Sequence, residues 1–160
     1  MKVLSLTQPW ATLVVIGAKQ FETRSWKTSY RGPLLIHASK KFPRDCKLLA
    51  FEEPFFAALR DKLRVPTSVT AHPHPLPTGR IIGKVKLFDC ITTDEWMIEH
   101  CDEVKTEHHE RELHVKSEWW NEYQFGDFSY GRFAWQLEDP EEIPVPIPVK
   151  GKLGLWEFPL

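Results

Sequence analysis

The sequence predicts an α+β fold, a curved sheet or small β-barrel flanked by helices. Six or so short runs of alternating or apolar residues, bounded by turn residues, are typical of strands. Two other segments carry apolar residues at helical spacing. A chain of 160 residues can bury roughly 70% of its unfolded surface, which is enough for a core without metals or disulfides. Since no internal repeat or second domain is evident, we expect a single domain over residues 1–160.

The first 40 residues are expected to contain three extended segments and one helix. Residues 2–7 alternate and fit a short strand. Pro9 suits a first helical position, and apolar residues recur at helical spacing until Gly17 ends the helix. Residues 20–26 are expected to be extended, and residues 34–38 form a short apolar strand after a turn.

The middle of the chain is expected to be helical and then extended. Residues 43–63 show helical spacing, and Pro54 divides them into two helices or kinks one. The proline-rich interval 65–79 is expected to be an irregular connection. Residues 81–92 should form the longest strand, with Gly83 marking a bulge. A short helix is expected at residues 94–100.

The last third mixes a charged segment with further strands. Residues 102–118 have few apolar anchors, which favours a solvated helix or loop, and residues 118–123 favour a helical turn. Three more strands are expected from the apolar patterns near the end of the chain, at residues 132–137, 145–149 and 153–158. The last two strands are separated by a Lys-Gly-Lys turn at residues 150–152.

The charge composition excludes a global attraction to nucleic acid or anionic lipid. The 21 basic and 22 acidic residues give a formal net charge of −1, so any basic surface must be local. One basic stretch is interleaved with aromatic residues and is either a patch that follows a nucleic-acid backbone or an ordinary solvated face. It consists of Lys27, Arg31, Lys40, Lys41 and Arg44.

The cysteines and histidines do not predict a metal site or a disulfide framework. Cys46, Cys90 and Cys101 form an odd set without a CxxC pair, and no secretion leader is recognisable, so we expect free thiols in the cytoplasm. The histidines in the segment 107–114 are not spaced as HExxH, and we expect no metal and no cofactor. No apolar run approaches the length of about 20 residues that crosses a bilayer, so no membrane partner is expected.

Three charged residues, Lys19, Glu22 and Arg24, are concentrated between the first helix and the next extended segment. In an extended chain Glu22 and Arg24 point to the same face, and Lys19 can reach over the same cleft. A carboxylate accepts from an exocyclic amine, a guanidinium binds phosphate or carbonyl oxygen, and a buried lysine can act as base or nucleophile. The alternative is a structural ion cluster that fastens helix to strand.

Other candidate ligand-binding residues lie near this segment. Gln8 and Trp10 begin the first helix, where free N–H groups favour an anion and the indole can stack on a base or belong to the core. Trp26 and Tyr30 lie in a turn beside Arg31 and suit stacking. His37 lies in an apolar strand and either faces the cleft or is satisfied by a local hydrogen bond.

Five segments together resemble one known family. They read LSLTQPWATLVVIGAKQFETRSW, YRGPLLIHASKK, LPTGRIIGKVKLFDC, YGRFAWQLEDP and PIPVKGKLGLWEF, and the first contains a GxKxxExR motif. The chain resembles the activating-signal-cointegrator homology (ASCH) domain of the PUA-like superfamily. This resemblance implies a small β-barrel flanked by helices, a cleft floored by the motif, a role in binding RNA or DNA and, in a few members, hydrolytic activity.

Two classes of function follow. The first is a nucleic-acid-binding module in which RNA or single-stranded DNA lies across the cleft and one base is inspected by the motif. Its expected ligand-binding residues are Gln8, Trp10, Lys19, Glu22, Arg24, Trp26, Tyr30, Arg31, His37, Lys40 and Lys41. The alternative is a hydrolase in the same cleft, with Lys19 and Glu22 as catalytic residues.

The resemblance implies two chemistries for such a hydrolase. One is removal of the acyl group from a modified nucleoside such as N4-acetylcytidine, and the other is cleavage of RNA with Lys19 and His37 moving protons. Members with the amidohydrolase activity carry a threonine in the motif where this chain has Glu22.

Overall fold

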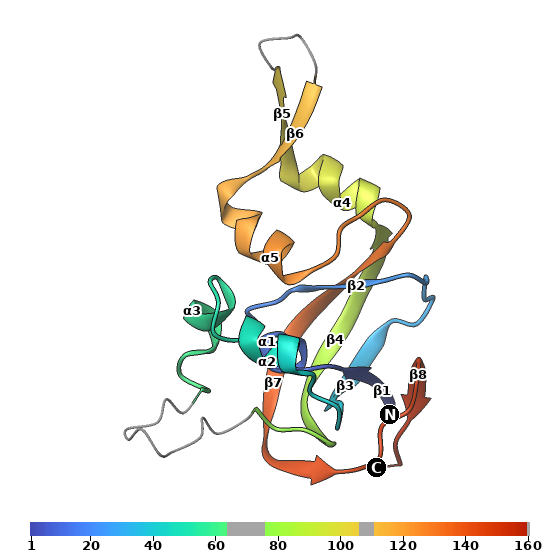
Figure 1. The fold of residues 1–160 in the computed structure, drawn as a ribbon. Helices are drawn as coiled ribbons and strands as arrows, with labels where there is room; N and C mark the ends of the chain where they lie inside the picture. The colour runs from blue at the N-terminus through green and yellow to red at the C-terminus, as the bar shows by residue number, and fades with distance from the viewer. Residues whose placement is uncertain (64–75, 106–110, 160) are drawn as a thin grey trace, which may run out of the picture.

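A computed structural model describes residues 1–63, 76–105 and 111–159 (Figure 1). Its main sheet has six strands in the order β2-β7-β4-β3-β1-β8, with β1 and β3 parallel and the other neighbours antiparallel. The strands are β1 (Lys2–Leu6), β2 (Phe21–Arg24), β3 (Gly32–Ala38), β4 (Arg80–Thr92), β7 (Phe133–Pro148) and β8 (Leu155–Glu157). A separate hairpin of β5 (Cys101–Lys105) and β6 (Arg111–Val115) projects from the body.

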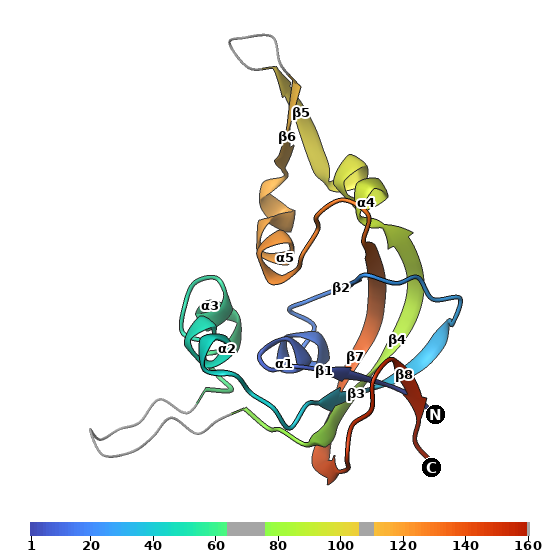
Figure 2. The same ribbon diagram turned by 45° about the vertical axis from the view of Figure 1, so that its right-hand side comes forward.

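The helices lie inside and beside this sheet. They are α1 (Trp10–Val15), α2 (Arg44–Leu49), α3 (Phe55–Leu59), α4 (Thr93–His100), a 3₁₀ turn (Ser117–Trp119) and α5 (Trp120–Phe125). Figure 2 shows the sheet curling around α1, with α2 and α3 on the far side of that helix.

Helix α1 is buried on two sides because all of its residues except Thr12 are apolar. Val14 and Val15 pack with Leu34, Ile36 and other residues on the concave face of the sheet. On the opposite side of α1, Leu13 belongs to a second cluster, which also contains residues of α3 and α5. The short helix therefore fixes the sheet and the outer helices relative to each other.

The curl of the sheet brings strands together that are not neighbours in its order. Arg24 ends β2, at one edge of the sheet, and its Nη2 donates to the carbonyl of Ser5 on β1 at 3.1 Å. Register shifts occur between Ile81 and Gly83, and such irregularities increase bending and twist. A Cβ on Gly83 would lie 2.4 Å from Cγ1 of Val15, so only glycine allows α1 to approach the sheet this closely.

Most elements expected from the sequence are confirmed, including the two helices divided by Pro54 and the irregularity at Gly83. The α+β class with a curled sheet is also confirmed, and the sheet forms a half-barrel rather than a closed one. Most of the connection expected at 65–79 lies outside the described residues. The single domain over 1–160 stays a prediction.

Three expectations about strands were wrong. Residues 102–118 contain most of the β5–β6 hairpin instead of a solvated helix or loop, because antiparallel pairing satisfies the backbone without a continuous apolar face. The longest strand is β7, with 16 residues against 13 in β4. The strands expected at 132–137 and 145–149 are both parts of β7, which stays paired with β4 through several register shifts.

Among the described residues, no helix has the length and apolarity needed to cross a bilayer. All three cysteines are free thiols. The cytoplasmic location inferred from them stays a prediction.

Candidate nucleic-acid interface

The largest hollow bordered by the predicted site residues is a cleft of about 860 Å³ at one end of the sheet, here named the basic cleft. Its described lining includes five cationic side chains and no aspartate or glutamate. The polar and charged lining residues are Ser5, Thr7, Arg24, His37, Ser39, Lys40, Lys41, Lys150 and Lys152. An anionic ligand therefore meets positive charge from several directions.

The sheet topology explains why these residues meet. Strands β1 and β3 are parallel, so their carboxyl ends lie side by side. Ser5 and His37 therefore lie together at the same end of the sheet. Strand β8 runs antiparallel to β1, so the loop that precedes β8, residues 149–154, lies at this same end of the sheet. The N–H of Gly79 donates to the carbonyl of Ala38 at 2.8 Å, and the N–H of Val149 donates to the carbonyl of Gly79 at 3.2 Å. These hydrogen bonds connect the loop to the end of β3.

His37 and Gly151 hold the lysine-bearing loop in place. Nε2 of His37 donates to the carbonyl of Val149 at 3.1 Å. A Cβ on Gly151 would lie 2.4 Å from Cε1 of His37, so a side chain there would displace the loop that carries Lys150 and Lys152. Burial lowers the pKa of His37, and the hydrogen bond to Val149 only partly opposes this, so the ring is neutral at physiological pH.

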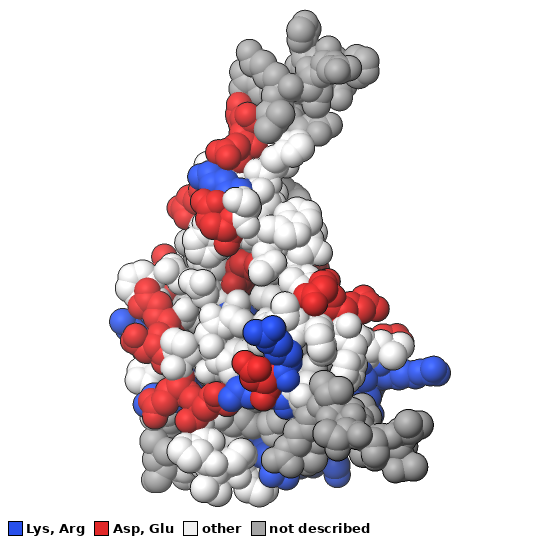
Figure 3. All heavy atoms as spheres, turned by 90° about the vertical axis from the view of Figure 1, so that its left-hand side faces the viewer, with Lys and Arg blue, Asp and Glu red and all other residues white. Residues whose placement is uncertain are grey.

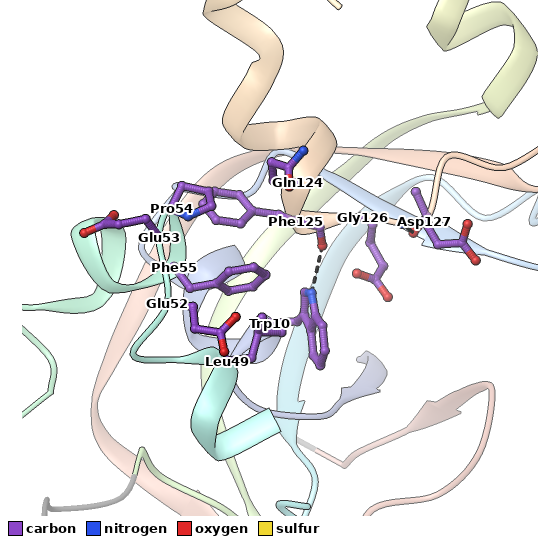
Figure 4. Close-up of a pocket in the computed structure, with 12 residues that line it drawn as sticks. Trp10, Leu49, Glu52, Glu53, Pro54, Phe55, Gln124, Phe125, Gly126 and Asp127 are labelled. Carbon is purple, nitrogen blue, oxygen red and sulfur yellow. Dashed lines mark hydrogen bonds between the residues drawn. The ribbon is translucent and has the colours of Figure 1, made fainter. Parts of the chain in front are cut away.

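A second hollow, of about 440 Å³, lies near the first and is named the acidic pocket (Figure 4). Its lining comes from the start of α1, from β2, from the α2–α3 connection and from the end of α5. The lining residues are Trp10, Glu22, Thr23, Leu49, Glu52, Glu53, Pro54, Phe55, Gln124, Phe125, Gly126 and Asp127. Trp10 is fixed by a hydrogen bond from its Nε1 to the carbonyl of Phe125 at 2.7 Å.

Glu22 and Arg24 stand between the two hollows. They point to the same face of β2, as expected, and Nε of Arg24 lies 3.1 Å from Oε1 of Glu22. Glu22 lines the acidic pocket, whereas Arg24 lines the basic cleft. A single ion pair thus separates a negative hollow from a positive one.

Lys19 does not join Glu22 and Arg24 at either hollow. Its side chain is buried, and its Nζ donates to the carbonyl of Phe21 and lies 3.7 Å from Oε1 of Glu122 on α5. Glu122 also accepts hydrogen bonds from the backbone N–H groups of Gln20 and Phe21, at 2.7 and 2.9 Å. Burial raises the pKa of Glu122, while Lys19 and these hydrogen bonds lower it less. This lysine therefore fastens α5 beneath the motif.

Gln8 is fully buried and is used inside the fold. Its side-chain amide donates to the carbonyl of Pro77 at 2.8 Å and accepts from the N–H of Thr12 at 3.1 Å. Both groups of the amide are thus engaged with the backbone.

Three candidates from the β2–β3 connection line neither hollow. Trp26 packs edge-to-face on Trp135 at 4.6 Å, and the Tyr30 hydroxyl donates to the carbonyl of Pro33. Arg31 forms an exposed ion pair with Asp89 at 2.7 Å. Of the predicted residues, the structure therefore brings together Arg24, His37, Lys40 and Lys41 at the basic cleft, and Trp10 and Glu22 at the acidic pocket.

Sequence reasoning missed two groups of residues. The sequence predicted a turn at Lys150 and Lys152 but assigned these lysines no role. Two lysines on either side of a glycine indicate a basic site here only when it is known that β8, the strand that follows them, pairs with β1. Glu122 carries no signal in the sequence, because only the fold places it within reach of Lys19.

The face of the molecule that carries α3 and α5 has charges of both signs. Figure 3 shows the face that carries α3 and α5, where acidic and basic side chains are mixed around a broad uncharged area. The basic cleft is thus a local concentration of cations in a chain that is almost neutral.

Comparison with known proteins identifies the family. The ASCH domain matches residues 4–142. Activating signal cointegrator 1 from mouse and from human are each 29% identical to this chain over 158 residues, 97% of this chain but 22% of theirs. The chain thus spans about a fifth of the length of these relatives.

Solved structures of an ASCH protein from Zymomonas mobilis are also similar to this chain. The unmutated protein has 15% identity and a TM-score of 0.46, over 91% of this chain and 71% of that one. A serine-to-alanine mutant of the same protein has 16% identity and a TM-score of 0.45, over 92% of this chain and 73% of that one.

Lys19→Met is expected to lower the free energy of unfolding by about 3 kcal/mol, because it leaves the Glu122 carboxylate buried without its cation. Urea denaturation measures the change. The matched control is Lys84→Met, which breaks an exposed pair with Glu141 and should cost less than about 1 kcal/mol. Equal costs for the two variants would contradict the structural role of Lys19.

The free energy of unfolding should fall with pH below about 6.5 through His37, because the unfolded imidazole takes up a proton that the folded one resists. His37→Gln keeps a donor for Val149 but cannot titrate. We therefore expect its loss of stability between pH 7.5 and 5.5 to be smaller than that of the unmutated protein, as measured by urea denaturation at each pH. Parallel pH profiles would show that His37 is not held neutral.

Proposed function

The chain belongs to the ASCH domain family, and we propose that it binds a single strand of RNA or DNA along the basic cleft. The observation that carries the proposal is the lining of that cleft, where five cations meet without a described carboxylate in a chain of net charge −1. Cations along a groove neutralise phosphates and release their counterions, which supplies most sequence-independent affinity.

The loop of residues 149–154 and the segment after β3 supply the phosphate contacts. Lys40, Lys41, Lys150 and Lys152 are exposed, so their ammonium groups reach a ligand without moving buried structure. Arg24 is more constrained, since it already contacts Ser5 and Glu22, and a constrained guanidinium binds one phosphate in a defined orientation.

A single strand suits the two neighbouring hollows better than a duplex does. An unpaired base is free to leave the stack and enter a pocket while its backbone remains in a basic groove. The acidic pocket offers Trp10 and Phe55 as aromatic walls, and Glu22 as an acceptor for a base amine. In this arrangement Glu22 and Arg24 contact the ligand. Lys19 does not contact it and instead stabilises the motif through its ion pair with Glu122.

No observation on the described residues favours the hydrolase. The Nζ of Lys19 is engaged with Phe21 and Glu122, and Lys19 borders neither the basic cleft nor the acidic pocket. His37 lines the cleft without Lys19, so the two groups required to move protons in a ribonuclease do not face one hollow.

Lys41→Ala and Lys150→Ala should each weaken binding of fluorescein-labelled oligouridylate and oligothymidylate, and each should reduce the slope of log affinity against log salt by about 1. Fluorescence anisotropy at several KCl concentrations measures both quantities. The physical reason is that each variant removes one phosphate contact.

Arg31→Ala and Lys86→Ala are the matched controls. Both cations are exposed, both are paired with a carboxylate, and neither lines the basic cleft. They should leave affinity and salt slope close to those of the unmutated protein. If all four variants behave alike, or if no oligonucleotide binds, the cleft is not the interface.

A further inference from the structure

The acidic pocket is chemically the opposite of the basic cleft beside it. Four carboxylates line it, those of Glu22, Glu52, Glu53 and Asp127. Glu22 is paired with Arg24 at 3.1 Å and Asp127 with Arg132 at 3.2 Å. No lysine or arginine appears in its described lining. Phosphate is therefore excluded from this pocket, and a group rich in N–H donors is favoured.

Glu22 has hydrogen-bonding capacity that the fold leaves unused. The residue is only 8% exposed, yet none of the described residues donates a hydrogen bond to its carboxylate. Arg24 makes an ion pair with it, but the Nε–H of Arg24 is not aligned as a hydrogen bond. The Glu22 oxygens are not among the fully buried atoms of the described residues that lack a hydrogen bond, so the carboxylate is open to the pocket and can accept from a ligand that supplies donors.

The walls and size of the pocket suit a nucleobase. Trp10 and Phe55 provide aromatic surface, and the indole of Trp10 is held by its bond to Phe125. The volume of about 440 Å³ lies within the range of roughly 300–1,000 Å³ that is usual for small-molecule sites. The contact between Glu22 and Arg24 places the pocket next to the cleft, as a base lies next to its own phosphate.

We infer that the acidic pocket selects guanine, taken from a strand whose phosphates lie in the basic cleft. This inference rests on the proposed function. Guanine presents two adjacent donors, N1–H and N2–H, on one edge, and a carboxylate accepts such a pair through its two oxygens. Gln124, which also lines the pocket, carries an amide that can donate to O6.

The other bases fit the carboxylate less well. Adenine and cytosine each place an acceptor nitrogen beside their single amine, and uracil flanks its only N–H with two carbonyls. An acceptor that faces Glu22 repels it, which discriminates against these bases as strongly as the paired donors favour guanine.

The test uses fluorescein-labelled oligouridylates of equal length whose central residue is guanosine, inosine, adenosine, cytidine or uridine. At one fixed salt concentration, the guanosine probe should bind about tenfold more tightly than the uridine probe, as for a bidentate base contact. The inosine probe lacks only the N2 amine and should lose most of that advantage. This comparison needs no variant, so it remains decisive if a substitution at Glu22 impairs folding.

Glu22→Gln should bring the five affinities together, because an amide offers one donor and one acceptor in place of two acceptors. The matched control is Glu141→Gln, which changes an exposed carboxylate that pairs with Lys84 and lines neither hollow, and it should keep the ranking. Circular dichroism confirms that both variants are folded.

The outcomes separate this inference from the proposed function. Equal, salt-dependent affinities for all five probes would overturn the guanine assignment and leave the nucleic-acid-binding proposal standing. A preference for adenosine or cytidine would also overturn it. Failure of every probe to bind would overturn both. If a short arginine peptide occupied the pocket and the probes showed no base preference, the pocket would belong to a basic protein partner instead.

Discussion

The arrangement of this site depends on two contacts of the Arg24 guanidinium, one with Ser5 and one with Glu22. Arg24 belongs to an edge strand, yet it reaches the Ser5 carbonyl on β1 because the sheet curls around α1. The same side chain lies against Glu22. It therefore joins the two sides of the half-barrel and separates a positive hollow from a negative one, so the shape of the fold and the polarity of the site have a common origin.

The three charges of the GxKxxExR motif have three different environments. Lys19 is buried against Glu122, Glu22 is nearly buried at the acidic pocket, and Arg24 is partly exposed at the basic cleft. Buried ions require a partner, since the cost of desolvation otherwise exceeds the gain from attraction. The first charge of the motif therefore has a structural contact, whereas Glu22 and Arg24 pair with each other and each lines a hollow; that these two bind a ligand stays a prediction.

The sequence was sufficient for local structure wherever one element carries its own signal. Pro54 divides two helices, Gly17 follows the end of α1, and the alternation of residues 81–92 marks β4. It was insufficient where the pairing partner decides the outcome. Residues 102–118 lack an apolar face and still form most of a hairpin, because their pairing satisfies the backbone. The same limit explains why β7 was divided into two expected strands, since its prolines interrupt the pattern but not the pairing with β4.

The candidate site shows the same limit on a larger scale. Lys40 and Lys41 could be found as a basic pair, but their association with Lys150 and Lys152 depends on β8 pairing with β1 across the length of the chain. Arg31 belongs to the same basic stretch in the sequence, and yet the fold directs it to Asp89, away from the cleft. Clustering along the chain is thus a poor guide to clustering in space for this fold. A chain of net charge −1 can present a strongly basic groove because its topology gathers cations from separate segments and keeps carboxylates on the other side of one ion pair.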